Sequence, residues 1–231
     1  MASKLSKLID RHLEHYKRSE KTSFDKARRF YRGDFFTTSD SDLGGTQLDS
    51  HLCSKNLIYA IADTAVSALL GPNPSVAAVA RTPQSQESAT SVTGLLEYIY
   101  STNKFRRKAA TALIDAVLCK RGIFKTGWDA ERDMPIVRAV NPSSVFFDLT
   151  VRDQDDIRYW IEATVISFEE FKNRVRTGLY QADLVADVQP DRYPKWLQDQ
   201  NQSSDTQQLR DAFQWVTIYE FYDRETGKIQ H

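Results

Sequence analysis

The chain has 231 residues, 41% of them hydrophobic and 27% charged, so it is long enough to bury a core and too apolar to be disordered throughout. Its formal net charge of zero argues against tight, sequence-independent DNA binding, which needs a strongly basic surface. It contains neither the run of about 18 to 20 apolar residues expected of a membrane helix nor a signal-peptide pattern.

The charge is unevenly distributed along the chain. Residues 1–128 contain 19 Lys and Arg against 12 Asp and Glu, whereas residues 129–231 contain 12 against 19. Such asymmetry is compatible with copies that pack oppositely charged faces against one another. The two cysteines, Cys53 and Cys119, belong to no metal-binding pattern, which favours a reducing cytosol.

The first predicted elements are two amphipathic helices between Ser3 and Arg32, broken near residues 19–23. Their apolar residues recur at spacings of three and four: Leu5, Leu8, Ile9, Leu13, Phe24, Ala27, Phe30 and Tyr31. Gly33 is expected to end the second helix. Residues 34–49 form a polar loop that we expect to be disordered or ordered by a neighbouring molecule.

Residues 54–70 form the clearest predicted helix, and Gly71-Pro72 supplies its stop signal. Four of its residues lie along one apolar stripe: Leu57, Ile61, Ala65 and Leu69. Residues 75–81 have the pattern of a short apolar strand, and residues 83–91 that of a polar connection.

A second helical block is predicted over residues 91–102 and 104–121, with Gly122 as its cap. Its predicted buried face consists of Phe105, Ala109, Ala112, Leu113, Ala116 and Val117. After Gly122 the apolar period changes to two, which is typical of strands. The predicted strands cover residues 123–129, 135–140, 144–148, 157–165 and 213–222.

Ser167 and Glu170 form a capping box that predicts a helix over residues 168–177, stopped by Gly178. Residues 181–210 are polar and are expected to form short helices joined by mobile loops. The return strand after the turn at 223–227 is cut short, so the domain is expected to be incomplete at its C-terminus. Together the elements predict an α+β fold in which N-terminal helices pack on a mostly antiparallel sheet.

The tightest basic cluster, Lys104, Arg106, Arg107 and Lys108, is a candidate contact for nucleic acid or for a neighbouring subunit. The alternative is the solvated start of a helix, which is the more common role of such a run. Three arginines of the N-terminal helices complete the candidate set: Arg28, Arg29 and Arg32.

The acidic run Asp148, Asp153, Asp155 and Asp156 raises the alternative of a metal-dependent nucleic-acid phosphodiesterase, because hard cations prefer carboxylate oxygens. The run lacks the glycine and spaced glutamate of a calcium loop, so a solvated turn is the favoured interpretation. His12, Glu14 and His15 do not have the zinc-binding helical spacing either, and a surface helix is expected there. The sequence therefore predicts no catalytic residue, no metal and no cofactor.

Four tryptophans, Trp128, Trp160, Trp196 and Trp215, offer rings on which bases could stack. Three of them lie in predicted strands, where burial is the ordinary use of a large ring. Trp196 lies in the polar segment and is expected to anchor that segment or a partner.

The order of these elements resembles the N-terminal half of the phage portal, or head-to-tail connector, family. The matching strings are Arg29-Phe30-Tyr31-Arg32-Gly33-Asp34, Lys55-Asn56-Leu57-Ile58, Leu70-Gly71-Pro72-Asn73-Pro74, Gly127-Trp128-Asp129, Val140-Asn141-Pro142-Ser143-Ser144-Val145-Phe146-Phe147-Asp148, Ser167-Phe168-Glu169-Glu170-Phe171 and Glu220-Phe221-Tyr222-Asp223. Family members are longer and continue into stem, clip and crown parts, so the resemblance is to the wing alone. It implies N-terminal helices over 1–33, a polar loop over 34–53 and a wing-like α+β domain over 54–231.

The resemblance implies a structural subunit and not an enzyme. The subunit would belong to a ring of twelve copies at the unique capsid vertex, through which the genome is packaged and ejected and which joins head to tail. The implied partners are further copies of the chain, the major capsid protein, a head-tail adaptor, the terminase and double-stranded DNA, with no membrane. The implied location is the virion, and the host cytoplasm during assembly. Another virion adaptor protein is the remaining alternative.

Overall fold

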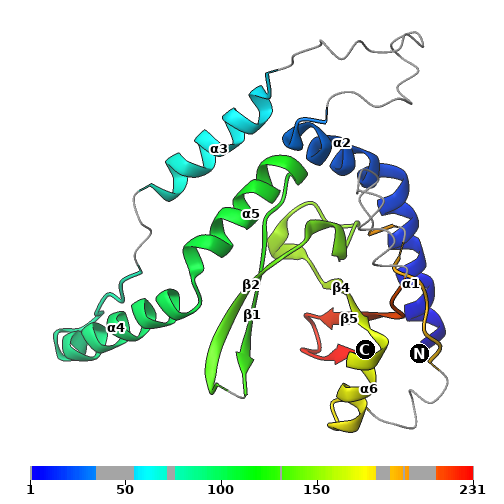
Figure 1. Cartoon of the computed structure of the whole chain (residues 1–231). Helices are drawn as coiled ribbons and strands as arrows, with labels where there is room; N and C mark the ends of the chain where they lie inside the picture. The colour runs from blue at the N-terminus through cyan, green and yellow to red at the C-terminus, as the bar shows by residue number, and fades with distance from the viewer. Residues whose placement is uncertain are drawn as a thin grey trace. The chain divides into compact units, whose positions relative to one another are not determined.

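The computed structural model describes residues 2–34, 55–71, 76–130, 132–180, 188–194, 196–197 and 212–230 (Figure 1). Apart from Asp34, the predicted loop over 34–49 lies outside these residues, as does most of the polar segment over 181–210. The chain forms two compact units: unit 1 comprises Met1–Asp25 and Ser143–His231, and unit 2 comprises Lys26–Pro142. No helix among the described residues is long and apolar enough to cross a membrane.

The helices and strands are largely segregated along the chain, as is typical of an α+β protein, with α1 to α5 before the first strand and α6 between strands. The helices are α1 (Ala2–His15), α2 (Lys21–Arg32), α3 (Leu57–Leu70), α4 (Gln86–Thr102), α5 (Phe105–Cys119) and α6 (Phe168–Arg176). The strands are β1 (Ile123–Asp129), β2 (Met134–Val140), β3 (Val145–Phe147), β4 (Tyr159–Ser167), β5 (Trp215–Asp223) and β6 (Ile229–Gln230). The pairs β1-β2 and β3-β4-β5-β6 are antiparallel throughout, which confirms the predicted fold class.

The two predicted N-terminal helices are not broken. His15 and Lys21 both have helical backbone angles, and residues Tyr16–Glu20 between them form a π-helical turn. This stretch contains no proline or glycine, so the backbone has no reason to leave the helical region. Gly33 ends α2 with a φ of +91°, as predicted.

Unit 1 has an aromatic core on one side of its sheet. The Tyr16 ring packs edge-on against Phe146 of β3 and against Trp196, with ring centroids 5.9 and 6.3 Å apart. Tyr16 is only 2% exposed and Trp196 only 8%. Trp196 therefore anchors its polar segment, one of the two roles expected for it.

A second core of unit 1 forms between α6 and the strands β4 and β5. Its buried residues are Ile166, Phe171, Val216 and Ile218. The Ser167 hydroxyl accepts a hydrogen bond of 3.2 Å from the Glu170 backbone N–H, and Gly178 ends the segment with a φ of +78°. The stop signal and the Ser167 half of the predicted capping box are confirmed, while the Glu170 carboxylate accepts from the Arg174 guanidinium at 2.9 Å.

In unit 2, α3 and α5 lie side by side (Figure 1). Val66 and Leu70 of α3 are buried with Ala109 of α5, and partly buried residues of α5 surround them. The stripe noted in the sequence faces away from this contact, since Leu57, Ile61 and Leu69 are all more than 60% exposed. The face of α3 that packs on α5 is therefore the neighbouring one.

The prediction of a strand over residues 75–81 is wrong for the described part, 76–81. The backbone N–H of Ala78 donates to the Thr93 hydroxyl of α4, at 3.0 Å, instead of to a strand partner. The adjacent helix begins earlier than predicted, at Gln86, because Thr82 and Ser85 cap each other across a 3₁₀ turn. Small apolar residues alone do not distinguish a strand from an extended segment laid on a helix.

The cap of α5 also differs from the prediction. Lys120 takes the left-handed conformation, with a φ of +63°, and ends the helix. Gly122 instead allows the backbone to pass close to α5, because a Cβ atom there would collide with the carbonyl oxygen of Ala112. Of the predicted buried face, Ala109 and Ala112 are buried, but Val117 is 48% exposed.

Asn103, in the turn between α4 and α5, fixes both helices to strand β2. Its side-chain NH₂ donates to the carbonyl oxygen of Pro135 at 2.8 Å, and its Oδ1 accepts from the Val137 backbone N–H at 3.0 Å. Asn103 is 6% exposed, so these bonds satisfy a buried amide. No local pattern in the sequence marks this residue.

Candidate interaction site

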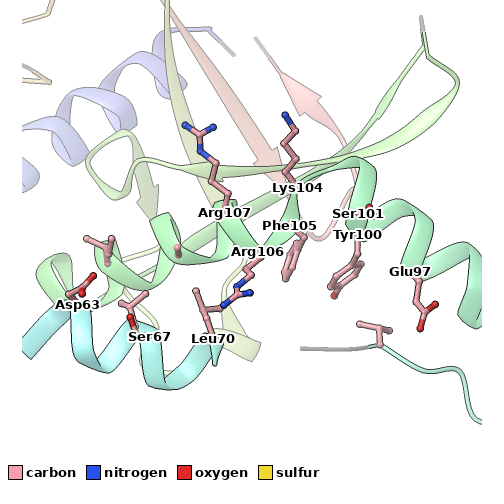
Figure 2. Close-up of a pocket in the computed structure, with 14 residues that line it drawn as sticks. Asp63, Ser67, Leu70, Glu97, Tyr100, Ser101, Lys104, Phe105, Arg106 and Arg107 are labelled. Atoms are coloured by element: carbon pink, nitrogen blue, oxygen red, sulfur yellow. The ribbon is translucent and has the colours of Figure 1, made fainter. Parts of the chain in front are cut away.

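The predicted basic cluster begins α5 in unit 2. Lys104 precedes the helix in a left-handed conformation, with a φ of +50°, which turns the chain sharply out of α4. In Figure 2, Arg106 extends toward Leu70 of α3, whereas Lys104 and Arg107 extend to the other side of α5. All three side chains are exposed, and none has an ion-pair partner within the part of the chain that the structure describes.

The start of α5 borders a groove of about 910 Å³ within unit 2, toward which the Arg106 side chain extends and from which those of Lys104 and Arg107 extend away (Figure 2). Its apolar lining comes from α3, α4, α5 and the segment after α3: Val66, Leu70, Val76, Tyr100, Phe105, Ala110 and Ile114. The rings of Tyr100 and Phe105 are 4.3 Å apart, and Phe105 also stacks on Phe124 at 5.5 Å. The groove therefore combines an apolar floor with one cation, Arg106.

Two carboxylates lie at opposite ends of this groove. Figure 2 shows Asp63 of α3 at one end and Glu97 of α4 at the other, with Arg106 between them. A long polyanion laid through the groove would meet both carboxylates, and like charges repel.

Lys108, the fourth member of the predicted cluster, has a different environment. Its ammonium group donates to the Oδ1 atom of Asn103 at 3.3 Å, next to the turn that Asn103 fixes. The structure thus places Lys104, Arg106 and Arg107 at the border of one groove, with only the Arg106 side chain extending toward its lining, and gives Lys108 a separate contact.

The predicted arginines of α2 do not line this groove. The Arg28 guanidinium donates to Asn141 Oδ1 at 2.8 Å and lies 3.8 Å from the carboxylate of Asp115. Burial raises the pKa of Asp115, and Arg28 partly opposes that rise. Arg29 lies over the Phe30 ring at 5.2 Å, and Arg32 is exposed. Arg28 is thus held in contacts internal to unit 2.

The acidic run of unit 1 is not a solvated turn along its whole length, which corrects the prediction for Asp148. One oxygen of the buried Asp148 carboxylate accepts from the backbone and hydroxyl of Thr150, at 3.0 and 2.6 Å. Its other oxygen accepts from the Arg158 guanidinium at 2.9 Å. Burial by itself would raise the pKa of Asp148, but these hydrogen bonds outweigh it, so the pKa is lowered.

The other three carboxylates of the run, Asp153, Asp155 and Asp156, are exposed. Asp153 caps a 3₁₀ turn by accepting from the Asp155 backbone N–H at 3.2 Å. Within the described ranges, no group of three or more His, Cys, Asp or Glu side chains is placed to hold a metal ion. The geometry gives the phosphodiesterase alternative no support, because the oxygens of Asp148 are already engaged.

His12 is buried, at 4% exposure, so the expected surface position is wrong for this residue. Its Nε2 atom lies 3.0 Å from the Tyr159 hydroxyl, and its ring packs near Phe146 with centroids 6.3 Å apart. Burial and the neighbouring His15 lower the pKa of His12, against a smaller opposing effect of Asp148. A signal was present in the sequence, because His12 lies on the same helical stripe as Leu8 and Ile9.

The tryptophans show that a strand position does not guarantee burial. Trp128 of β1 is 61% exposed, contrary to expectation, whereas Trp160 stacks on Tyr222 across β4 and β5 with ring centroids 5.1 Å apart. The β1-β2 pair is a two-stranded ribbon, so part of its surface has no covering layer within the described residues.

An antiparallel α+β chain whose described helices leave large apolar side chains uncovered is typical of a subunit that assembles with other molecules. Comparison with protein families agrees: the model of the phage P22-like portal proteins matches residues 7–230, so the chain belongs to this family. No curated protein sequence matches it. The resemblance found in the sequence is thereby confirmed, and the protein has a structural role as a portal component of the phage virion.

Proposed function

We propose that the chain builds the wing of a portal subunit, twelve copies of which form a ring at the unique vertex of the capsid. The ring is the conduit for genome packaging and ejection and the joint between head and tail. The observation that carries this proposal is the family match, which extends over residues 7–230. Its partners are the major capsid protein, a head-tail adaptor, the terminase and the double-stranded DNA that passes through the channel.

The wing assignment is supported by the exposed apolar surface of unit 2. Sixteen large hydrophobic side chains are exposed among the described residues, and twelve of them belong to unit 2. Exposed apolar surface is thermodynamically unfavourable in water unless another molecule covers it. We assign residues 54–231 to the wing, residues 1–33 to N-terminal helices and residues 34–53 to a connecting loop.

The proposed life cycle begins in the host cytoplasm, where copies assemble, and ends in the virion. We assign the basic residues at the start of α5, Lys104, Arg106, Arg107 and Lys108, to contacts with a neighbouring subunit or with DNA. The same proposal extends to Arg28, Arg29 and Arg32 of α2.

Native mass spectrometry of the intact protein, combined with images of the particles, tests the proposal. We expect a cyclic ring of twelve copies, located at one vertex when the capsid protein is present. A stable monomer under assembly conditions would contradict it. Particles that carry the protein at many sites instead of one vertex would favour another virion component.

A further inference from the structure

Helix α1 is held against the sheet of unit 1 through a histidine. Among its side chains at residues 4–15, whose burial the structure describes, only that of His12 is buried, at 4% exposure. The His12 ring lies 6.3 Å from that of Phe146 and edge-on to that of Tyr159, at 5.8 Å between centroids. The apolar residues of the same helix, such as Leu8 and Leu13, are only partly buried. The most buried side chain of α1 is therefore one that can gain a proton near neutral pH.

The polar partner of this imidazole is the Tyr159 hydroxyl, 3.0 Å from the Nε2 atom of His12. Within the described ranges, this is the only hydrogen bond that joins a side chain of α1 to a strand. Burial raises the pKa of Tyr159, so the phenol is uncharged in acidic and neutral solution. It can therefore bond to a neutral imidazole but cannot compensate the charge of a protonated one.

The charged groups that face His12 do not compensate that charge either. His15, one turn later on α1, repels a protonated His12 when it is itself protonated. Asp148, which follows β3, attracts it, but both oxygens of Asp148 already accept hydrogen bonds from Thr150 and Arg158. The Arg158 guanidinium, 2.9 Å from the carboxylate, opposes the attraction. Burial and His15 together outweigh Asp148, so the pKa of His12 is lowered.

We propose that protonation of His12 releases α1 from the sheet of unit 1 while the rest of the unit stays folded. A protonated ring would be a charge held between aromatic side chains, and water solvates that charge better once the helix is detached. Release uncovers the Tyr159 ring and the apolar stripe of α1, so acid creates an apolar surface that the neutral protein hides. The inference goes beyond the proposed ring, because every contact that it uses lies within one copy.

The remainder of unit 1 has its own stabilising contacts. The backbone pairs of β3 with β4 and of β4 with β5 do not involve α1. The core around Phe171 of α6 lies on the other face of the sheet, because Tyr159 and Ile166 are an odd number of positions apart on β4. Tyr16 begins the π-helical turn after α1 and packs against Trp196. Since helices bend readily at π-helical turns, this turn is the expected hinge.

Hydrogen exchange of backbone amides, measured by mass spectrometry on the intact protein at about pH 7.5 and about pH 5, tests the proposal. After correction for the intrinsic pH dependence of exchange, the protection of residues 2–15 should fall by up to about 30-fold at the lower pH. This limit follows from the ordinary pKa of 6.5 for a histidine that is exposed on release. Peptides from β4 and α6 should keep their protection.

Two variants on the same helix separate His12 from its neighbour. His12→Gln has a neutral side chain that can bond to the Tyr159 hydroxyl and cannot be protonated, so the protection of α1 should no longer depend on pH. His15→Gln changes an exposed position and is the matched control, which should retain most of the wild-type response. Circular dichroism checks that both variants are folded at both pH values.

A nuclear magnetic resonance titration of the His12 ring in the wild type needs no variant. Its midpoint should lie below pH 6.5 and coincide with the midpoint of the loss of protection in α1. Release of α1 while the ring is still neutral would overturn the inference.

Three results of the exchange experiment would also overturn it. The first is unchanged protection of residues 2–15 in the wild type at the lower pH. The second is a wild-type response in His12→Gln, or the loss of the response in His15→Gln, because either would assign the effect to another group. The third is an equal loss of protection in β4 and α6, because acid would then unfold unit 1 as a whole.

Discussion

Units 1 and 2 bury different kinds of side chain. Among the described residues, unit 1 buries large rings such as Tyr16, Phe146 and Trp196, and it leaves four large hydrophobic side chains exposed. Unit 2 buries mostly small ones and leaves twelve large ones exposed. The buried hydrophobic residues of unit 2 are Ala62, Val66, Leu70, Ala109, Ala112 and Cys119.

The difference has a physical cause in the helices of unit 2. Small residues on facing sides let two helices approach closely but remove little apolar area from water. The larger residues of α3, such as Ile61 and Leu69, lie on its other faces and stay exposed. Unit 1 thus buries most of its large apolar side chains within one copy, whereas unit 2 leaves many of its own available for contact with other molecules.

The largest expected effect comes from the aromatic core of unit 1. Tyr16→Ala should lower the free energy of unfolding by about 3 to 5 kcal/mol, because it removes a fully packed ring and leaves a cavity. Denaturant titration followed by tryptophan fluorescence measures the change, since Trp196 contacts the Tyr16 ring. The matched change Tyr98→Ala in unit 2, at a site 63% exposed, should cost about 0.5 kcal/mol or less. Equal losses of unfolding free energy at the two sites would contradict the contrast between the units.

A smaller difference in stability is expected between substitutions on the two faces of α3. Leu70→Ala should destabilise unit 2 by about 2 to 4 kcal/mol, because Leu70 is packed in the contact with α5. Leu69→Ala, one position earlier and 61% exposed, should change stability by about 0.5 kcal/mol or less in dilute protein. Thermal unfolding of both variants at low concentration compares them. A large loss of stability in the Leu69→Ala variant would show that the Leu69 side chain is covered within one copy.

The smallest effect is a pH dependence of unit 1. Because the pKa of His12 is lowered on folding from its ordinary 6.5, the unfolded chain binds this proton more readily than the folded one. The stability that neutral His12 provides is complete above about pH 6.5 and declines as the pH falls toward the folded-state pKa. His12→Gln should flatten this part of a plot of unfolding free energy against pH. An identical slope in wild type and variant would contradict the assignment.

Local patterns were sufficient to predict most of the strands and α6. Alternation marked β1 and β4, and the pair Ser167 and Glu170 located the start of α6, since a capping box involves only neighbouring residues. The strand expected over 75–81 failed because a strand depends on a partner, and its described part lies against α4 instead. The start of α4 was missed because Thr82 and Ser85 were not recognised as caps.

The candidate site could be predicted only in part. The cluster at Lys104–Lys108 was visible as a charge run, but the groove exists because α3 lies beside α5, which no local pattern specifies. The burial of His12 depends on Tyr159, 147 positions along the chain. Contacts over such distances are set by tertiary packing, and a single sequence records them weakly.

The discontinuity of unit 1 sets an order for folding on the ribosome. Unit 2 is one uninterrupted stretch, Lys26–Pro142, so all its contacts exist once that stretch has been synthesised. Tyr16 is made before that stretch, but its partners Phe146 and Trp196 are made after it. The nascent N-terminal helix therefore keeps its apolar stripe unmatched while unit 2 emerges, and during that interval the stripe is open to chaperones or to another nascent chain.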